Sequence, residues 1–164
     1  MEKVLVTGAT GYIALHCVQQ LLDQGYAVNG SIRSPERKNE VIEALKNSGT
    51  STENLNLYVF DLTNDEGWDD GMEGCDYLLH VASPLALENH TEDYFVKPAV
   101  AGAKRALKFA KKHGVKKVVL TSSVAAIFET GEEKVFYDES DWSDPDSPNI
   151  SNYAKSKTLA EKAA

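Results

Sequence analysis

The sequence is poor in the residues that build disulfide frameworks and metal centres. Its two cysteines, Cys17 and Cys75, are far apart and form no Cys-x-x-Cys pair, which predicts reduced thiols in a cytoplasmic protein. The histidines show no spacing typical of metal ligands, so we expect structural or surface roles for them and no metal site. The four are His16, His80, His90 and His113.

Long apolar runs and an excess of positive charge are also missing. No apolar stretch approaches the ~20 residues that a membrane-spanning helix needs. A strand-like segment follows directly after Met1-Glu2-Lys3, so we expect no signal peptide. The 17 Lys and Arg against 25 Asp and Glu give a net charge of -8, which argues against a nucleic-acid partner. We therefore expect neither a membrane nor a nucleic acid among the partners.

What the sequence does contain is a regular alternation of short apolar segments and helical patterns, which predicts an α/β fold with a doubly wound parallel sheet. The 164 residues are expected to form one domain. Pro98 predicts a late start or a kink in the long helix, and either Ser147-Pro148 or Ser151 can cap the last one. The expected strands are 4–6, 26–32, 55–60, 77–82 and 117–123; the expected helices cover 13–22, 41–45, 92–113 and the segment from 153 to 157.

A glycine-rich turn stands where the first strand meets the first helix, in the run Val6 to Ala14. Gly8 permits the tight turn, and Gly11 lets the backbone approach a pyrophosphate at the helix N-terminus. Ala14 keeps the helix close to the strand. This placement within a βαβ unit predicts a dinucleotide site. The predicted contacts along the turn are Thr7, Gly8, Thr10, Gly11, Tyr12 and Ile13.

The end of the second strand indicates which dinucleotide is preferred. An NAD site usually places Asp or Glu there to accept a hydrogen bond from the ribose 2′-hydroxyl. This sequence has Ser31-Ile32-Arg33 instead, with Arg37 and Lys38 close behind. A guanidinium suits a 2′-phosphate, so Arg33 and Lys38 predict a preference for NADP(H), with NAD(H) as the alternative. A solvated basic start to the second helix remains the other interpretation of Arg37 and Lys38.

Tyr153 and Lys157 lie four residues apart, about one helical turn, so a helix presents both on the same face. A phenol releases its proton reluctantly near neutral pH, and an ammonium in poorly solvated surroundings stabilises the phenolate. The spacing also arises by chance on exposed helices, so it predicts proton-transfer chemistry only together with the glycine turn. Ser123, at the end of the fifth strand, can reach the same sheet edge as this helix.

These motifs together resemble the extended short-chain dehydrogenase/reductases, part of the NAD-dependent epimerase/dehydratase superfamily, and most closely the dihydroflavonol 4-reductase-like group. The resemblance covers nearly the whole chain, and its most group-specific run is 137–143. The runs that carry it are Thr7 to Ala14, Ile32-Arg33, Asp61-Leu62, His80-Val81-Ala82-Ser83-Pro84, Leu120-Thr121-Ser122-Ser123, Tyr137-Asp138-Glu139-Ser140-Asp141-Trp142-Ser143 and Tyr153-Ala154-Lys155-Ser156-Lys157.

The resemblance implies a Rossmann-type fold and reversible hydride transfer between NADP(H) and a small-molecule carbonyl. Ser123 would bind the carbonyl oxygen and Tyr153 would donate the proton. Lys157 would hold the nicotinamide ribose and stabilise the phenolate. Ala14 departs from the family, where glycine is commonest. The resemblance implies further cofactor contacts, in addition to the glycine turn, Arg33 and Lys38. These are Asp61, Leu62, Val81, Ala82, Ser83, Thr121, Tyr153 and Lys157.

The family continues well beyond the last residue of this sequence, so we expect a chain truncated before the substrate-binding part. Two other functions therefore stay open. The chain could bind NADP(H) as a non-catalytic sensor module, or it could be an inactive fragment. In the fragment, the fifth strand would lack its usual neighbour, and the exposed edge would favour self-association.

Overall fold

The computed structural model describes residues 1–85, 90–129 and 134–164. The chain forms two compact units. The first comprises residues 1–82 and 105–121, and the second comprises residues 83–104 and 122–164. The assignment of residues 1–164 to a single cofactor-binding domain stays a prediction, since each unit has its own set of buried residues.

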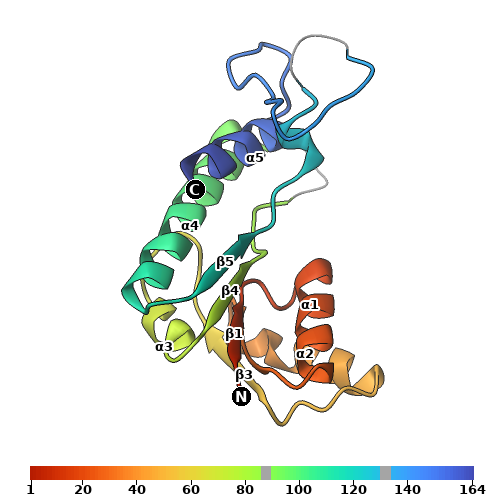
Figure 1. Ribbon diagram of the computed structural model, residues 1–164, viewed down its shortest axis with the longest axis vertical. Coiled ribbons are helices and arrows are strands. Elements are labelled where there is room, and N and C mark those ends of the chain that lie inside the picture. The colour runs from red at the N-terminus through yellow and green to blue at the C-terminus, as the bar shows by residue number, and fades with distance from the viewer. Residues whose placement is uncertain (86–89, 130–133) are drawn as a thin grey trace. The chain divides into compact units, whose positions relative to one another are not determined.

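The first unit is built on a five-stranded sheet with the order β3-β2-β1-β4-β5 (Figure 1). Every neighbouring pair is parallel, which confirms the predicted doubly wound α/β fold. The chain leaves β1 toward β3 and then returns to the other side of β1 for β4, so the topological switch point lies between β1 and β4. The strands are β1 (Lys3–Val6), β2 (Ala27–Ile32), β3 (Leu55–Val59), β4 (Tyr77–His80) and β5 (Lys117–Leu120).

The first face of the sheet is covered by α1 (Tyr12–Asp23) and α2 (Lys38–Asn47), with the short helix η1 (Pro35–Arg37) between β2 and α2. Alternation along β1 directs Val4 and Val6 into this cluster and Leu5 into the opposite one. Both α1 and α2 bury an apolar stripe against the strands. The buried residues of this cluster are Val4, Val6, Ala9, Ala14, Val18, Val28, Ile32, Val41 and Leu45.

The opposite face carries α3 (Trp68–Met72) and residues 105–112 of α4 (Glu92–Lys112). The sequence does not predict α3, because five residues are too few to show a helical apolar period. Its place is set by packing: Trp68 stacks on Phe109 at 5.8 Å between ring centroids. Asn29 of β2 also donates from Nδ2 to the Gly71 carbonyl at 2.8 Å. A buried indole and a buried amide therefore fix this short helix.

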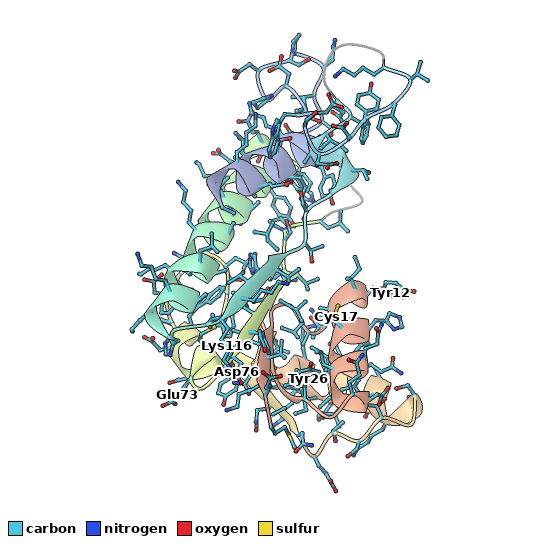
Figure 2. All side chains as sticks on the ribbon, viewed as in Figure 1. Tyr12, Cys17, Tyr26, Glu73, Asp76 and Lys116 are labelled. Atoms are coloured by element: carbon cyan, nitrogen blue, oxygen red, sulfur yellow. The ribbon has the colours of Figure 1, made fainter. Side chains whose placement is uncertain are left out.

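Both cysteines are free thiols, as expected. Cys17 packs at the border of the first cluster, on the apolar face of α1 (Figure 2). Cys75 is buried in the second cluster, where desolvation raises the pKa of its thiol to about 11. A thiol with so high a pKa is protonated at neutral pH and unreactive, so the position has a packing role.

The second unit contains residues 92–104 of α4, the 3₁₀ turn η2 (Val124–Ala126) and α5 (Asn152–Ala163). Contacts at the N-terminal ends join the two helices: Lys155 pairs with Glu92 at 3.0 Å, and Asn152 Nδ2 donates to the His90 carbonyl at 2.9 Å. The predicted long loop over 129–149 carries no helix or strand in its described residues. The buried apolar residues of η2 and α5 are all alanines, namely Ala125, Ala126, Ala154 and Ala160, and α5 also buries Ser156, Lys157 and Thr158.

α4 begins at Glu92, as expected, and continues through Pro98, so the late start that the proline could have caused does not occur. The ends of β4 and β5 are predicted too late. β4 ends at His80 and β5 at Leu120, before the predicted ends at 82 and 123. After His80 the backbone N–H groups of Val81 and Ala82 bond to a threonine side chain rather than to a strand, which ends the ladder.

β5 forms one edge of the five-stranded sheet, next to β4, and Val119 on it is 46% exposed. This matches the expectation of an uncovered strand, while self-association through it stays a prediction. None of the helices in the described ranges has the length and apolar character needed to cross a membrane.

Candidate functional site

The glycine turn lies between β1 and α1, at the switch point of the sheet. Gly8 has a φ of +74°, and a Cβ on it would meet the Ala82 Cβ at 3.1 Å. Both the left-handed backbone and the close approach require glycine here. Gly11 is the N-cap of α1 and makes no side-chain capping bond. The first N–H groups of α1 are thus suited to an anion, as the dinucleotide prediction requires.

The end of β2 holds this turn in place. The Gly8 N–H donates to Ser31 Oγ at 2.8 Å, and the Ala9 N–H donates to the Ser31 carbonyl at 2.8 Å. Thr10 is half-buried, whereas Tyr12 and Ile13 are 81% and 55% exposed. Figure 2 shows Tyr12 extending from the first turn of α1. The two exposed residues therefore present their side chains beside the uncapped helix end.

Thr7 connects the end of β1 to the end of β4. Its Oγ1 accepts from the N–H groups of Val81 and Ala82, both at 3.0 Å, and lies 3.0 Å from His80 Nδ1. With both lone pairs of the oxygen engaged, the hydroxyl proton points to Nδ1, so the histidine carries its own proton on Nε2. The buried Thr7 and His80 side chains thus fix Val81 and Ala82, two predicted cofactor contacts. The structural role expected for His80 is confirmed.

The basic residues after β2 differ in their surroundings. Arg33 follows the last residue of β2 and is exposed, and Lys38, the first residue of α2, is exposed as well. Arg37 instead forms an ion pair with Glu40, with Nη2 and Oε2 2.7 Å apart. This hydrogen bond lowers the pKa of the Glu40 carboxyl. Arg33 and Lys38 are therefore better placed than Arg37 to meet a ligand phosphate.

Two more predicted cofactor residues follow β3. The Asp61 carboxylate accepts from the N–H and the hydroxyl of Thr63, at 2.8 and 2.6 Å, and its carbonyl accepts from Trp68 Nε1 at 2.9 Å. The Leu62 carbonyl accepts from the Arg105 guanidinium. Both residues are half-buried at the carboxyl edge of the sheet, where folds of this class bind ligands.

Thr121, the last residue of the first unit, lies at the same carboxyl edge. Its N–H donates to the His80 carbonyl at 2.9 Å, which places it beside the end of β4. Its side chain is half-buried. Ser83 belongs to the second unit and is half-buried too.

The three predicted catalytic residues all belong to the second unit. Ser123 has an extended backbone and is the N-cap of η2, with its Oγ accepting from the Ala125 N–H at 3.2 Å. Because the oxygen is the acceptor in this bond, the hydroxyl proton can be donated to a substrate oxygen. η2 packs against α5, which brings the turn of Ser123 to the helix of Tyr153 and Lys157.

α5 begins at Asn152, directly after one of the two caps that the sequence predicts. Ser151 is the N-cap, and its Oγ accepts from the Ala154 N–H at 3.1 Å. Tyr153 follows in the first turn and is half-buried, with the Phe95 ring edge-on at 6.4 Å between centroids.

Lys157 is buried, with 6% of its surface exposed. Its Nζ lies 5.9 Å from the centroid of the Tyr153 ring, so the predicted common face of the two residues is confirmed. Burial lowers the pKa of the Lys157 ammonium, and the negative charge of Glu161 opposes this. The phenol therefore has a cation as its neighbour in poorly solvated surroundings.

A polar network that the sequence does not reveal fixes η2 and the start of α5. Ser143 is fully buried; its Oγ donates to the Ala125 carbonyl at 2.8 Å and accepts from the Glu129 N–H at 2.9 Å. The Glu129 carboxylate accepts from the N–H and Oγ of Ser151, at 2.8 and 3.0 Å. Ser143 ends the group-specific run 137–143, which is the one signal that could have pointed to it.

Among the residues described, no group of three or more His, Cys, Asp and Glu side chains could hold a metal ion. The residues that gather around α5 are instead a hydroxyl, a phenol and an ammonium. This combination can donate hydrogen bonds to an oxygen and transfer a proton, without a metal ligand set.

Comparison with known proteins gives the lineage. Vestitone reductase from Medicago sativa is 40% identical over 169 residues, which cover 98% of this chain and 52% of that protein. Dihydroflavonol 4-reductase from Solanum lycopersicum is 37% identical over 168 residues, 98% of this chain and 44% of that protein. The chain thus spans about half the length of the curated relatives it matches.

The solved structures agree with this lineage. The yeast methylglyoxal/isovaleraldehyde reductase, in a complex with NADPH, matches with a TM-score of 0.84 and 33% identity, over 99% of this chain and 51% of that one. The predicted likeness to the dihydroflavonol 4-reductase group is confirmed. The model described as "NAD dependent epimerase/dehydratase family" matches residues 4–164. This chain is a member of the NAD dependent epimerase/dehydratase family.

Proposed function

We propose that this chain carries the cofactor-binding and proton-transfer parts of an NADP(H)-dependent reductase that converts a carbonyl to an alcohol. The observation that carries this proposal is the buried Lys157 ammonium beside the ring of Tyr153, on a helix that packs against the turn of Ser123. The names of the relatives, all reductases, support it.

The glycine turn would hold the pyrophosphate. Gly8 and Gly11 would let the backbone approach the anion because neither carries a Cβ, while their N–H groups donate to Ser31 Oγ and to the Gly8 carbonyl. The uncapped end of α1 would supply the donors and positive potential. Thr10, Tyr12 and Ile13 would line the site of this anion. Thr7 would act indirectly, because its Oγ1 accepts from the N–H groups of Val81 and Ala82 and so holds these two residues in place.

Arg33 and Lys38 would bind a 2′-phosphate on the adenosine ribose. Ser31, two residues before Arg33, uses its Oγ to accept from the Gly8 N–H and is not an acidic partner for a 2′-hydroxyl. The solved yeast relative contains NADPH, which supports the same preference in this chain. Asp61 and Leu62 would flank the adenine, and Val81, Ala82, Ser83 and Thr121 would line the path of the ribose and phosphates.

NADPH, when bound, would supply the hydride that adds to the carbonyl carbon of the substrate. The Tyr153 hydroxyl would donate its proton to the carbonyl oxygen as negative charge develops there. Ser123 would donate a hydrogen bond to the same oxygen, and this bond strengthens as the charge grows. The Lys157 ammonium would stabilise the resulting phenolate and bind the nicotinamide ribose.

The cofactor preference can be measured by calorimetric titration of the chain with NADPH and with NADH. Arg33→Ala is expected to weaken NADPH binding about 10- to 100-fold, because a hydrogen bond between charged groups is worth ~1.5–3 kcal/mol. NADH binding should hardly change. Arg37→Ala is the matched control, since Glu40 already holds that guanidinium. Equal weakening of NADPH and NADH by Arg33→Ala would remove this residue from the 2′-phosphate site.

A sensor module that binds NADP(H) without turnover is the alternative from another functional class. Ser123, Tyr153 and Lys157 occur together and share one unit, which favours catalysis. Following NADPH absorbance with a panel of aldehydes, ketones and flavonoid-like substrates separates the two. NADPH binding with no consumption across the panel would favour the sensor.

An inactive fragment is the second alternative, and the exposed edge strand β5 is its main property. Val119 on this strand is exposed, so the fragment is expected to self-associate. Size-exclusion chromatography with light scattering measures this directly. A stable monomer would count against pairing through β5.

A further inference from the structure

The last turn of α5 carries a carboxylate that the proposed chemistry does not use. Tyr153, Lys157 and Glu161 follow one another at intervals of four, so they form one stripe along the helix. Glu161 is half-buried rather than fully solvated. Charged side chains are seldom withdrawn from solvent unless they have a partner, so we expect partners of this carboxylate among the residues around α5.

Glu161 contacts the residue next to the predicted catalytic serine. The Ser122 Oγ donates a hydrogen bond to Glu161 Oε2, and both residues belong to the second unit. Ser122 immediately precedes Ser123, whose extended backbone sends adjacent side chains to opposite sides. Ser122 thus ties the segment to α5, while the Ser123 hydroxyl is directed elsewhere.

Glu161 also acts on Lys157 through space. Lys157 is 6% exposed, and burial disfavours its charged form. Among the groups that face this ammonium are the Tyr153 ring and the Glu161 carboxylate on α5. η2, which packs against the helix, contains the apolar residues Val124, Ala125 and Ala126. The carboxylate is the charge that opposes the effect of burial.

We propose that Glu161 is a positioning residue that ties the Ser123 segment to α5 through Ser122 and keeps Lys157 an ammonium. The inference rests on the proposed reductase function for its meaning, yet both of its effects exist in the protein without cofactor. The tether needs only a hydrogen-bond acceptor at position 161, whereas the effect on Lys157 needs the negative charge. Two substitutions therefore separate the effects.

Glu161→Gln keeps an acceptor for Ser122 and removes the charge. In protein with ¹³C-labelled lysine, the NMR titration of the Lys157 Cε resonance should move to lower pH in this variant. Ser122→Ala keeps the charge and removes the tether, so the Lys157 titration should stay in place. Glu139→Gln, at an exposed position, is the matched control for the loss of one negative charge.

The tether is measured by hydrogen exchange of the Ala126 N–H, which donates to the Ser123 carbonyl at 2.9 Å. Ser122→Ala should speed this exchange about tenfold, the equivalent of one lost hydrogen bond to a charged group. Glu161→Gln should speed it less. An unmoved Lys157 titration in Glu161→Gln, or unchanged exchange in Ser122→Ala, would overturn the proposal.

Turnover adds a third readout that separates this inference from the proposed function. If the chain consumes NADPH, Glu161→Gln should shift the alkaline limb of the kcat profile to lower pH, and Ser122→Ala should lower kcat without that shift. If the chain consumes none, the reductase proposal fails, while titration and exchange still decide the role of Glu161. Equal loss of folding stability in both variants with no change in titration would make the role merely structural and overturn the proposal.

Discussion

Different interactions stabilise the interior of each of the two units. Among the residues that the structure describes, the twelve largest fully buried side chains all lie in the first unit, Trp68, Leu5 and Met72 among them. In the second unit, Phe95, alanines and polar residues fill the buried positions, and Ser143 and Glu129 join its segments by hydrogen bonds. Apolar burial gives the first unit its stability, whereas in the second directional bonds fix the geometry of the proposed catalytic groups.

The largest expected effect on stability concerns the apolar core of the first unit. Trp68→Ala should lower the free energy of unfolding by ~3–5 kcal/mol, the usual cost of truncating a buried aromatic side chain. Trp68 is fully buried between Phe60 and Phe109. Urea denaturation measures the loss. Trp142→Ala is the control, since that side chain is 38% exposed and should cost far less. Similar losses in both variants would contradict the contrast between the units.

In the second unit, the loss of a single hydroxyl group should already lower the free energy of unfolding. Ser143→Ala leaves the Ala125 carbonyl and the Glu129 N–H without their partner, which should cost ~1–3 kcal/mol per buried group left unsatisfied. Ser140→Ala is the control, because Ser140 is exposed and its hydroxyl donates to the Asp138 carboxylate within the same turn. The free energies of unfolding of the two variants should differ accordingly. A neutral Ser143→Ala would mean that the network does not hold this unit together.

The smallest expected effect concerns the ion pair at the amino ends of β4 and β5, marked by Asp76 and Lys116 in Figure 2. The hydrogen bonds from the Lys116 ammonium and the Lys3 N–H lower the pKa of the Asp76 carboxyl. A lowered folded-state pKa stabilises the fold above the unfolded value of about 4, and this contribution disappears as the pH falls through the folded-state value.

Asp76→Asn should therefore lower the stability slightly at neutral pH, and the gap to the unmodified chain should close toward acid pH. Thermal unfolding at several pH values and salt concentrations measures this. Asp70→Asn, at an exposed position, serves as the control. A gap that stays constant with pH would show that the charge of Asp76 contributes nothing.

The same contrast explains how much the sequence could predict. The sheet, α1, α2 and α4 follow from apolar periodicity, which is a local signal. Gly8 could be assigned because a left-handed, crowded turn admits only glycine, and a Cβ on Gly11 would meet the Gly8 carbonyl oxygen at 3.2 Å. α3 could not be predicted, because Trp68 is placed by partners distant in the sequence.

The candidate site was predictable only in part, for the same reason. Tyr153 and Lys157 share a helical face, which spacing alone reveals. The bonds of Ser143 to Ala125 and Glu129, and of Ser122 to Glu161, join residues with no periodic relation. Thr7 was expected to contact the cofactor, yet its hydroxyl is engaged with Val81, Ala82 and His80.

The most direct test of the account is the rate of NADPH consumption by Tyr153→Phe, measured beside the calorimetric affinity for NADPH. We expect the turnover number to fall by about 10²–10⁴, the usual contribution of a general acid, while the affinity stays unchanged. Tyr94→Phe is the matched control, since Tyr94 is 43% exposed on α4. Equal turnover by Tyr153→Phe and the unmodified chain would contradict the role of Tyr153 as proton donor.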